Sequence, residues 1–182
     1  MKRLLALFKI ILGAILVGML GYALVAGSAL LLYREPSLQL GESITFSKPS
    51  GDQPIPYLKS GWAYPEAWGV WTLGKKASLA LPLPNNAKTL VITGRALVSK
   101  EHPSQIVDIY FGDTLAKSVI LNQTDGNRMT IDLTKAVGVT DANGAKQLLI
   151  TLVLPKAVKP KDIGIGDDER ELAFGLHSLE FH

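Results

Sequence analysis

The feature that most constrains how this chain folds is an uncharged run of 24 residues over positions 10–33. The run consists mostly of Leu, Ile, Val, Ala and Gly. A helix of this length extends for about 36 Å, which exceeds the ~30 Å hydrocarbon core of a bilayer. The run therefore predicts a single transmembrane helix over 10–33, preceded by a short tail over 1–9.

A cleaved signal peptide is the alternative interpretation of the same run. Small residues at 26–28 offer a cleavage point, but the apolar run continues through Leu32. The apolar region of a signal peptide spans only about 7–15 residues, which favours an uncleaved anchor. The positive-inside rule then places the tail in the cytoplasm and residues 34–182 outside it, because three basic residues precede the run: Lys2, Arg3 and Lys9.

The charge balance excludes one class of partner. The chain has 19 basic and 16 acidic residues, and three of the basic residues lie in the tail over 1–9. The other 16 equal the number of acidic residues in 34–182, so that segment has no net charge. A nucleic-acid-binding domain concentrates positive charge on its folded part, so we predict no nucleic-acid partner. The absence of cysteine excludes thiol catalysis and cysteine zinc sites.

Strand-like runs bounded by turn residues follow the uncharged run. Residues 34–56 contain four prolines and one short strand-like segment, 43–46, which indicates a juxtamembrane segment that ends in an edge strand. Residues 57–182 contain alternating runs with turn signals such as Gly-Asp, Asp-Gly and Asn-Gly between them. This pattern predicts an all-β, jelly-roll-like antiparallel β-sandwich outside the cytoplasm. The predicted strands are 76–83, 88–99, 105–111, 114–121, 128–133, 146–154 and 171–182.

All three tryptophans of the chain lie in one short stretch, 61–72: Trp62, Trp68 and Trp71. Tryptophan combines a large apolar area with one N–H donor. Three interpretations remain open for the stretch: core packing, an exposed aromatic platform for a sugar ring with Glu66 as hydrogen-bond partner, and a protein-contact surface.

Strand alternation divides these aromatic residues between two sides. Trp68 and Trp71 have opposite parity, so an extended backbone points them to different faces. We therefore expect Trp71 in the core. Trp62, Tyr64 and Trp68, around the turn at 65–66, are the surface candidates.

The densest charge of the domain lies directly before the last predicted strand, at Asp167, Asp168, Glu169 and Arg170. It is interpreted as a solvated loop, as a structural pair between Arg170 and a loop carboxylate, or as a calcium site. A glycosidase that pairs Glu66 with Asp167 or Asp168 is a further alternative. Neither a nucleophile elbow nor a helical histidine pair is present, so no catalytic residue, metal ligand or cofactor is predicted.

Two stretches carry a family resemblance: GWAYPEAWGVWTLGKKASLALPLP at 61–84 and DIGIGDDERELAFGLHSLEF at 162–181. They are similar to a bacterial extracytoplasmic β-sandwich domain of unknown function, associated with membrane glycosyltransferases and surface-polysaccharide assembly. The resemblance implies a bacterial inner-membrane protein with a periplasmic domain. It transfers no catalytic residue. This chain has one predicted span and no glycosyltransferase domain, so a role in sugar transfer requires a partner protein.

These observations lead to one functional prediction and one alternative. The prediction is a non-enzymatic, single-pass accessory module that binds a glycan or a glycan-assembly enzyme. Its candidate ligand-binding residues are Trp62, Tyr64, Glu66, Trp68, Asp168 and Arg170. The alternative is a structural subunit whose transmembrane helix docks on a polytopic membrane partner, which small residues at Ala14 and Gly18 favour.

Overall fold

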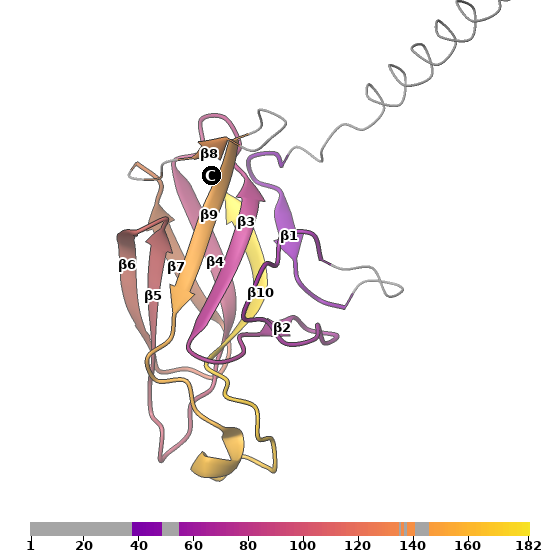
Figure 1. The fold of residues 1–182 in the computed structure, drawn as a ribbon, viewed down its shortest axis with the longest axis vertical. Coiled ribbons are helices and arrows are strands. Elements are labelled where there is room, and N and C mark those ends of the chain that lie inside the picture. Colours follow the sequence, from indigo (N-terminus) through magenta and orange to yellow (C-terminus); the bar gives the residue numbers. More distant parts are fainter. Residues whose placement is uncertain (1–37, 49–54, 135, 137, 141–145) are drawn as a thin grey trace, which may run out of the picture. The chain divides into compact units, whose positions relative to one another are not determined.

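A computed structural model describes residues 38–48, 55–134, 136, 138–140 and 146–182 (Figure 1). The predicted transmembrane segment over 10–33 lies outside these residues. Within the described part of the chain, no helix has the length and apolar character needed to cross a bilayer. The described residues belong to one compact unit, Leu38–His182.

The unit consists of two antiparallel sheets, as predicted from the strand-like runs (Figure 1). Sheet A has the strand order β1 (Ser43–Thr45), β10 (Phe174–Phe181), β4 (Thr89–Ala96) and β7 (Asn127–Asp132), with β2 (Val70–Trp71) also paired to β10. Sheet B has the order β3 (Lys76–Pro82), β9 (Lys146–Val153), β5 (Gln105–Phe111) and β6 (Thr114–Leu121), with β8 (Val139–Thr140) also paired to β9.

Apart from β5 and β6, which form a hairpin within sheet B, successive main strands alternate between the two sheets in the order of a jelly roll. When the two short strands β2 and β8 are left out, eight strands remain. The first of these lies beside the last in sheet A, and the second lies beside the next-to-last in sheet B. The segment predicted as an edge strand at 43–46 does form β1, which pairs with β10 at the edge of sheet A. Phe46, directly after β1, is fully buried and joins the core.

Alternation along the strands produces the core between the two sheets. In β5, Val107, Ile109 and Phe111 are buried while the residues between them are partly exposed. The same period of two buries Met129 and Ile131 in β7. Apolar side chains of both sheets meet in one continuous cluster, which accounts for the face-to-face packing.

Gly94 allows a close approach in the middle of sheet A. A Cβ atom at this position would lie 2.2 Å from the carbonyl oxygen of Gly175 and 2.5 Å from the Phe174 ring. The ladder between β4 and β10 shifts register directly beyond this point, between Leu176 and Ser178. The shift is a bulge that places His177 on the surface.

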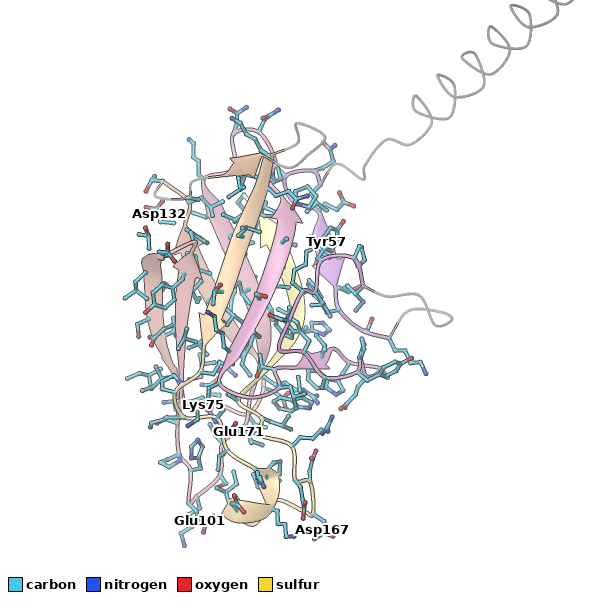
Figure 2. The ribbon with its side chains drawn as sticks, viewed as in Figure 1. Tyr57, Lys75, Glu101, Asp132, Asp167 and Glu171 are labelled. Carbon is cyan, nitrogen blue, oxygen red and sulfur yellow. The ribbon has the colours of Figure 1, made fainter. Side chains whose placement is uncertain are left out.

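A second, smaller apolar cluster supports the loops at one end of the sandwich. It contains Leu97, Ile163 and Leu172, with Trp71 packed against it. Ile163 ends the short 3-10 helix η1 (Pro160–Ile163). Figure 2 shows Glu101 and Asp167 at this end and Asp132 at the opposite end. The cluster thereby fixes the loop that carries Arg170.

Candidate functional site

The tryptophan stretch folds back on itself as a hairpin. The Glu66 N–H donates to the carbonyl oxygen of Gly69 at 2.7 Å, which closes a two-residue turn. Farther from the turn, Trp62 pairs with Thr72. The rule that residues of opposite parity in one extended strand point to opposite faces does not apply across such a turn.

The prediction that Trp68 and Trp71 face different sides is therefore wrong. Their rings contact each other edge to face, with centroids 5.2 Å apart and an interplanar angle of 71°. Trp71 also packs against the small apolar cluster, and both rings remain partly exposed. The two indoles act as one aromatic unit on the hairpin.

Gly175 of β10 allows these two rings to lie close to the backbone of sheet A. A Cβ atom there would lie 2.4 Å from Cη2 of Trp68 and 3.1 Å from Cε3 of Trp71. Only a residue without a side chain lets the Trp68 ring lie so close to sheet A. The ring is thus held against the outer face of the sheet.

A cleft of about 270 Å³ opens beside the Trp68 ring. Its floor is β4, and its walls come from the hairpin, the β10 bulge and the loop before β7. We call it the Trp68 cleft. The residues that line it are Trp68, Thr93, Gly94, Arg95, Asp125, Gly126 and His177.

Arg95 connects the two walls of the Trp68 cleft. Its guanidinium carbon lies 4.5 Å from the centroid of the Trp68 ring, a cation–π contact. The Arg95 Nε also forms an ion pair with Asp125. Both side chains of the pair are substantially exposed, so the pair contributes little energy and a ligand can displace the guanidinium at small cost.

A chain of polar groups begins at the Trp68 N–H and lies outside the lining of the cleft. The Trp68 indole N–H donates to Glu66 at 2.8 Å, and the Arg170 guanidinium lies 3.8 Å from the second oxygen of the same carboxylate. Arg170 also donates to Asp168 in a bidentate pair, from Nε to Oδ1 at 3.1 Å and from Nη2 to Oδ2 at 2.6 Å. The structure thus brings together four of the predicted residues: Glu66, Trp68, Asp168 and Arg170.

The bidentate pair determines the protonation of Asp168. Side-chain and backbone hydrogen bonds from Arg170 lower the pKa of Asp168, and the same contact raises the pKa of Arg170. Asp168 is therefore ionised at neutral pH and offers only acceptors. A general acid of a glycosidase needs a raised pKa, so this carboxylate does not fit that role.

His177 presents a defined hydrogen-bonding edge to the cleft. Its Nδ1 lies 2.6 Å from the carbonyl oxygen of Trp68. A carbonyl oxygen only accepts, so Nδ1 carries the proton and Nε2 of the neutral ring is an acceptor. The same contact ties the β10 bulge to the tip of the hairpin.

Of the six predicted ligand-binding residues, only Trp68 lines the cleft. Glu66, Asp168 and Arg170 are connected to it through the Trp68 N–H, whereas Trp62 and Tyr64 lie elsewhere. Trp62 packs against the main core, and its indole N–H donates to the carbonyl oxygen of Ser78 at 2.7 Å. Tyr64 is 63% exposed, and the Lys48 ammonium lies 5.5 Å from its ring centroid. Trp62 therefore serves packing, while Tyr64 stands on the hairpin outside the cleft.

Sequence reasoning missed the cleft residues outside the hairpin: Thr93, Arg95, Asp125 and His177. Arg95 and Thr93 carry a usable signal, since both occupy outward positions of a strand that otherwise buries apolar residues. Asp125 begins a turn, and turns commonly contain aspartate. His177 has no signal of its own, because the bulge that exposes it depends on pairing with β4.

The charged loop contains a structural ion pair, which is one of the three interpretations predicted for it. Arg170 and Asp168 form that pair, and Lys161 donates to Glu169 at 2.7 Å. Among the described residues, no group of three histidine, aspartate or glutamate side chains is placed to hold a metal ion.

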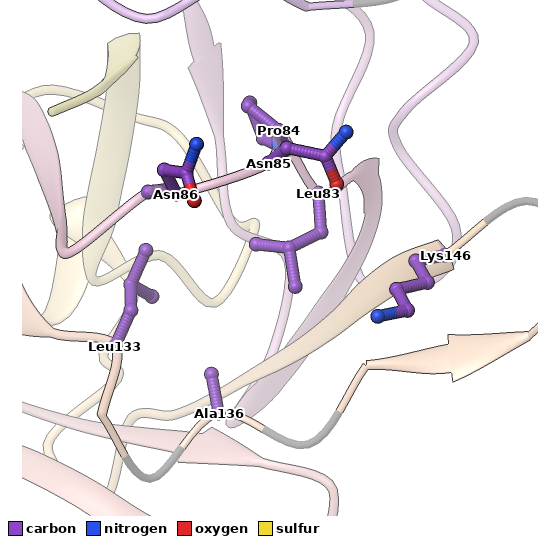
Figure 3. A pocket seen from close by; sticks show the side chains of 8 residues that line it. Leu83, Pro84, Asn85, Asn86, Leu133, Ala136 and Lys146 are labelled. Carbon is purple, nitrogen blue, oxygen red and sulfur yellow. The ribbon is translucent and has the colours of Figure 1, made fainter.

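A second hollow lies at the opposite end of the sandwich, with a volume of about 190 Å³ (Figure 3). Leu83, Asn85, Asn86, Leu133 and Lys146 contribute to its lining. Within its described lining there is no aromatic ring and no carboxylate. Its described lining therefore lacks the aromatic ring and the carboxylate that line the Trp68 cleft.

Comparisons with known proteins place the chain in no established family. No protein-family model and no curated protein matches it. One similar solved structure is the CBM36-1 domain of a multidomain xylanase from the hindgut metagenome of Trinervitermes trinervoides. It has 14% sequence identity and a TM-score of 0.39, over 78% of this chain and 97% of that chain. A similarity of this level carries no functional argument.

Proposed function

We propose that this chain is a non-enzymatic accessory module whose β-sandwich binds a glycan in the Trp68 cleft. One observation carries the proposal: an indole ring lines an open cleft together with a guanidinium, a carboxylate and an imidazole edge. An indole face packs on the apolar face of a pyranose, and the surrounding polar groups donate to and accept from its hydroxyls. The volume of about 270 Å³ suits a ligand of small-molecule size.

The proposal extends to the location of the module. The uncharged run over 10–33 would anchor it in a bacterial inner membrane, with the sandwich in the periplasm. The resemblance of 61–84 and 162–181 to domains linked with surface-polysaccharide assembly supports a polytopic glycosyltransferase as the partner. In this arrangement the sandwich holds the glycan and the partner performs the transfer.

Glycan-array binding by the full-length chain tests the proposal. The chain should be kept in a detergent without a sugar headgroup, because a glycosidic detergent competes for the same cleft. We expect binding to a defined set of glycans. Trp68→Ala should abolish binding, because the substitution removes the aromatic wall.

Tyr64→Ala is the matched control for this experiment. It removes an exposed aromatic ring from the same hairpin without changing the lining of the cleft. Asp125→Ala is a second cleft variant, and it leaves the packed tryptophan pair intact. If Tyr64→Ala abolishes binding while both cleft variants retain it, the part of the hairpin around Tyr64 is the site. If no glycan binds to the folded chain, glycan binding is excluded.

Exposed apolar side chains on β6 favour a second candidate, a structural subunit of a membrane complex. Ile120 is 69% exposed, and Leu115 on the same strand is also exposed. Their cross-strand neighbours are Ile106 and Tyr110, so apolar groups gather on the outer face of sheet B. Co-purification of a polytopic enzyme without any glycan binding would support this candidate over the first.

A further inference from the structure

A row of polar side chains crosses the outer face of sheet A and passes through the Trp68 cleft. Thr93 lines the cleft, and the strand register places it between Ser178 on β10 and Arg128 on β7. Ser178 in turn is the partner of Thr45 on β1. We call these four residues the polar row: Thr45, Ser178, Thr93 and Arg128.

The members of the polar row point outward and are accessible. Thr45 and Arg128 are exposed, while Ser178 and Thr93 are partly exposed. Directly opposed residues in antiparallel strands share one face, and the residues before and after Arg128 are buried in the core. In the described part of the chain, no hydrogen bond, ion pair or ring contact engages these four side chains. They are available to a ligand.

The outer face of sheet B has a different chemistry. It carries Ile106, Leu115, Ile120 and Leu149, and its line of hydroxyl groups, Ser78, Thr151 and Tyr110, ends at Leu115 on β6. The two outer faces therefore differ in the fourth strand. Among the described strands, only the face beside the Trp68 cleft combines hydroxyl groups with a guanidinium in a line across four strands.

The length of the polar row sets the size of the ligand. Neighbouring strands lie about 4.8 Å apart, so four strands span about 14 Å. This distance exceeds one pyranose ring and matches an extended oligosaccharide that lies across the strands. Hydroxyl groups donate and accept, and a guanidinium donates to ring and hydroxyl oxygens.

We propose that the polar row is an extended subsite that binds a linear oligosaccharide, with one sugar ring in the Trp68 cleft and the following units across sheet A. The proposal rests on the glycan binding proposed above. It predicts a preference for internal segments of a chain over single sugars. Outside the cleft, Thr45, Ser178 and Arg128 contribute hydrogen bonds that a monosaccharide in the cleft does not reach.

Isothermal titration of the full-length chain tests the subsite. The probes are a tetrasaccharide of the glycan identified on the array and the corresponding methyl monosaccharide. We expect the tetrasaccharide to bind at least tenfold more tightly. Thr45→Val should weaken tetrasaccharide binding by roughly 2- to 10-fold, the effect of one or two lost hydrogen bonds, and leave monosaccharide binding unchanged.

Thr151→Val is the matched control, because it makes the same substitution on the outer face of sheet B and should change neither affinity. Arg128→Gln provides a second row variant at the far end of the row from Thr45. Equal affinities for the two probes, with no effect of either row variant, would overturn the subsite and leave glycan binding in place. Failure of both probes to bind would instead contradict the proposed function itself.

Discussion

At the scale of single residues, Trp68 links three separate parts of the chain. Its ring edge rests on Gly175, its face meets Arg95, and its N–H donates to Glu66. The contacts with Gly175 and Glu66 remain when a ligand displaces Arg95, so the aromatic wall of the cleft is held in place before any ligand arrives. Preorganisation of this kind reduces the entropy lost on binding.

Gly175→Ala should displace the Trp68 ring. The added methyl group would overlap Cη2 of Trp68, and overpacking of this kind costs about 1–3 kcal/mol. We expect a lower denaturation midpoint, altered tryptophan fluorescence and weaker glycan binding. Gly138→Ala is the control, since its new Cβ would meet only ordinary contacts, the nearest at 3.4 Å. Unchanged fluorescence in Gly175→Ala would show that the position of the Trp68 ring does not require a glycine at 175.

The ion pair between Arg170 and Asp168 makes a small, pH-dependent contribution to stability. The pKa of Asp168 is lowered in the folded chain, so the stabilisation is fully present above about pH 4 and is lost as the pH falls through the folded-state pKa. For an exposed pair we expect at most about 1 kcal/mol at neutral pH.

Carboxyl titration by NMR checks this contribution. Arg170→Gln should raise the pKa of Asp168 back toward its ordinary value, and the stability difference from the unmodified chain should shrink as the pH falls through the folded-state pKa of Asp168. Lys100→Gln removes an exposed cation elsewhere and should leave the pKa of Asp168 unchanged. An unaltered pKa in Arg170→Gln would contradict the assigned cause.

At the scale of strands, the open side of the sandwich between β6 and β7 is closed by a lysine. The Lys117 ammonium donates to the carbonyl oxygen of Thr130 at 2.6 Å and thereby bridges the edge strands of the two sheets. A lysine on an edge strand also discourages pairing with a second molecule. One side chain thus serves both the closure of the sandwich and its solubility.

Lys117→Met should weaken this edge. We expect a stability loss of about 0.5–1.5 kcal/mol from the missing hydrogen bond and increased self-association from the exposed backbone. Sedimentation velocity at several concentrations measures the association. Lys100→Met adds the same apolar side chain on a loop and should remain as monodisperse as the unmodified chain. A monodisperse Lys117→Met would show that the edge is protected by other means.

The strands were predictable because their signal is local. Alternation between core and surface placed seven predicted runs within three residues of the observed strands, as in 105–111 and β5. The cleft was not predictable in the same way. Arg95, Asp125 and His177 meet through the hairpin turn and the β10 bulge, and both features depend on pairing between segments far apart in sequence. The prediction that Trp68 and Trp71 face different sides failed for the same reason, because it ignored the hairpin turn.

At the scale of the whole molecule, the β-sandwich begins before the tryptophan hairpin. The fully buried Phe46 and the pairing of β1 with β10 make the segment after Leu38 part of the folded unit. A fragment over 38–182 should unfold cooperatively, whereas a fragment over 57–182 loses β1 and the Phe46 ring. Removal of a buried phenylalanine side chain alone costs about 3–5 kcal/mol.

Denaturant unfolding of the two fragments measures this difference. Phe46→Ala in the longer fragment separates the contribution of the ring from that of strand pairing. We expect the order of stability to be 38–182, then Phe46→Ala, then 57–182. Equal midpoints for 38–182 and 57–182 would show that β1 is dispensable for the folded unit.

The central position of β10 has a consequence for how the protein is made. This strand is the last in chain order, yet it separates β1 from β4 and also pairs with β2. Sheet A therefore stays incomplete until the segment 174–181 has been synthesised. Contacts between segments so far apart in sequence form slowly, so we expect the completion of sheet A to be a late step in folding.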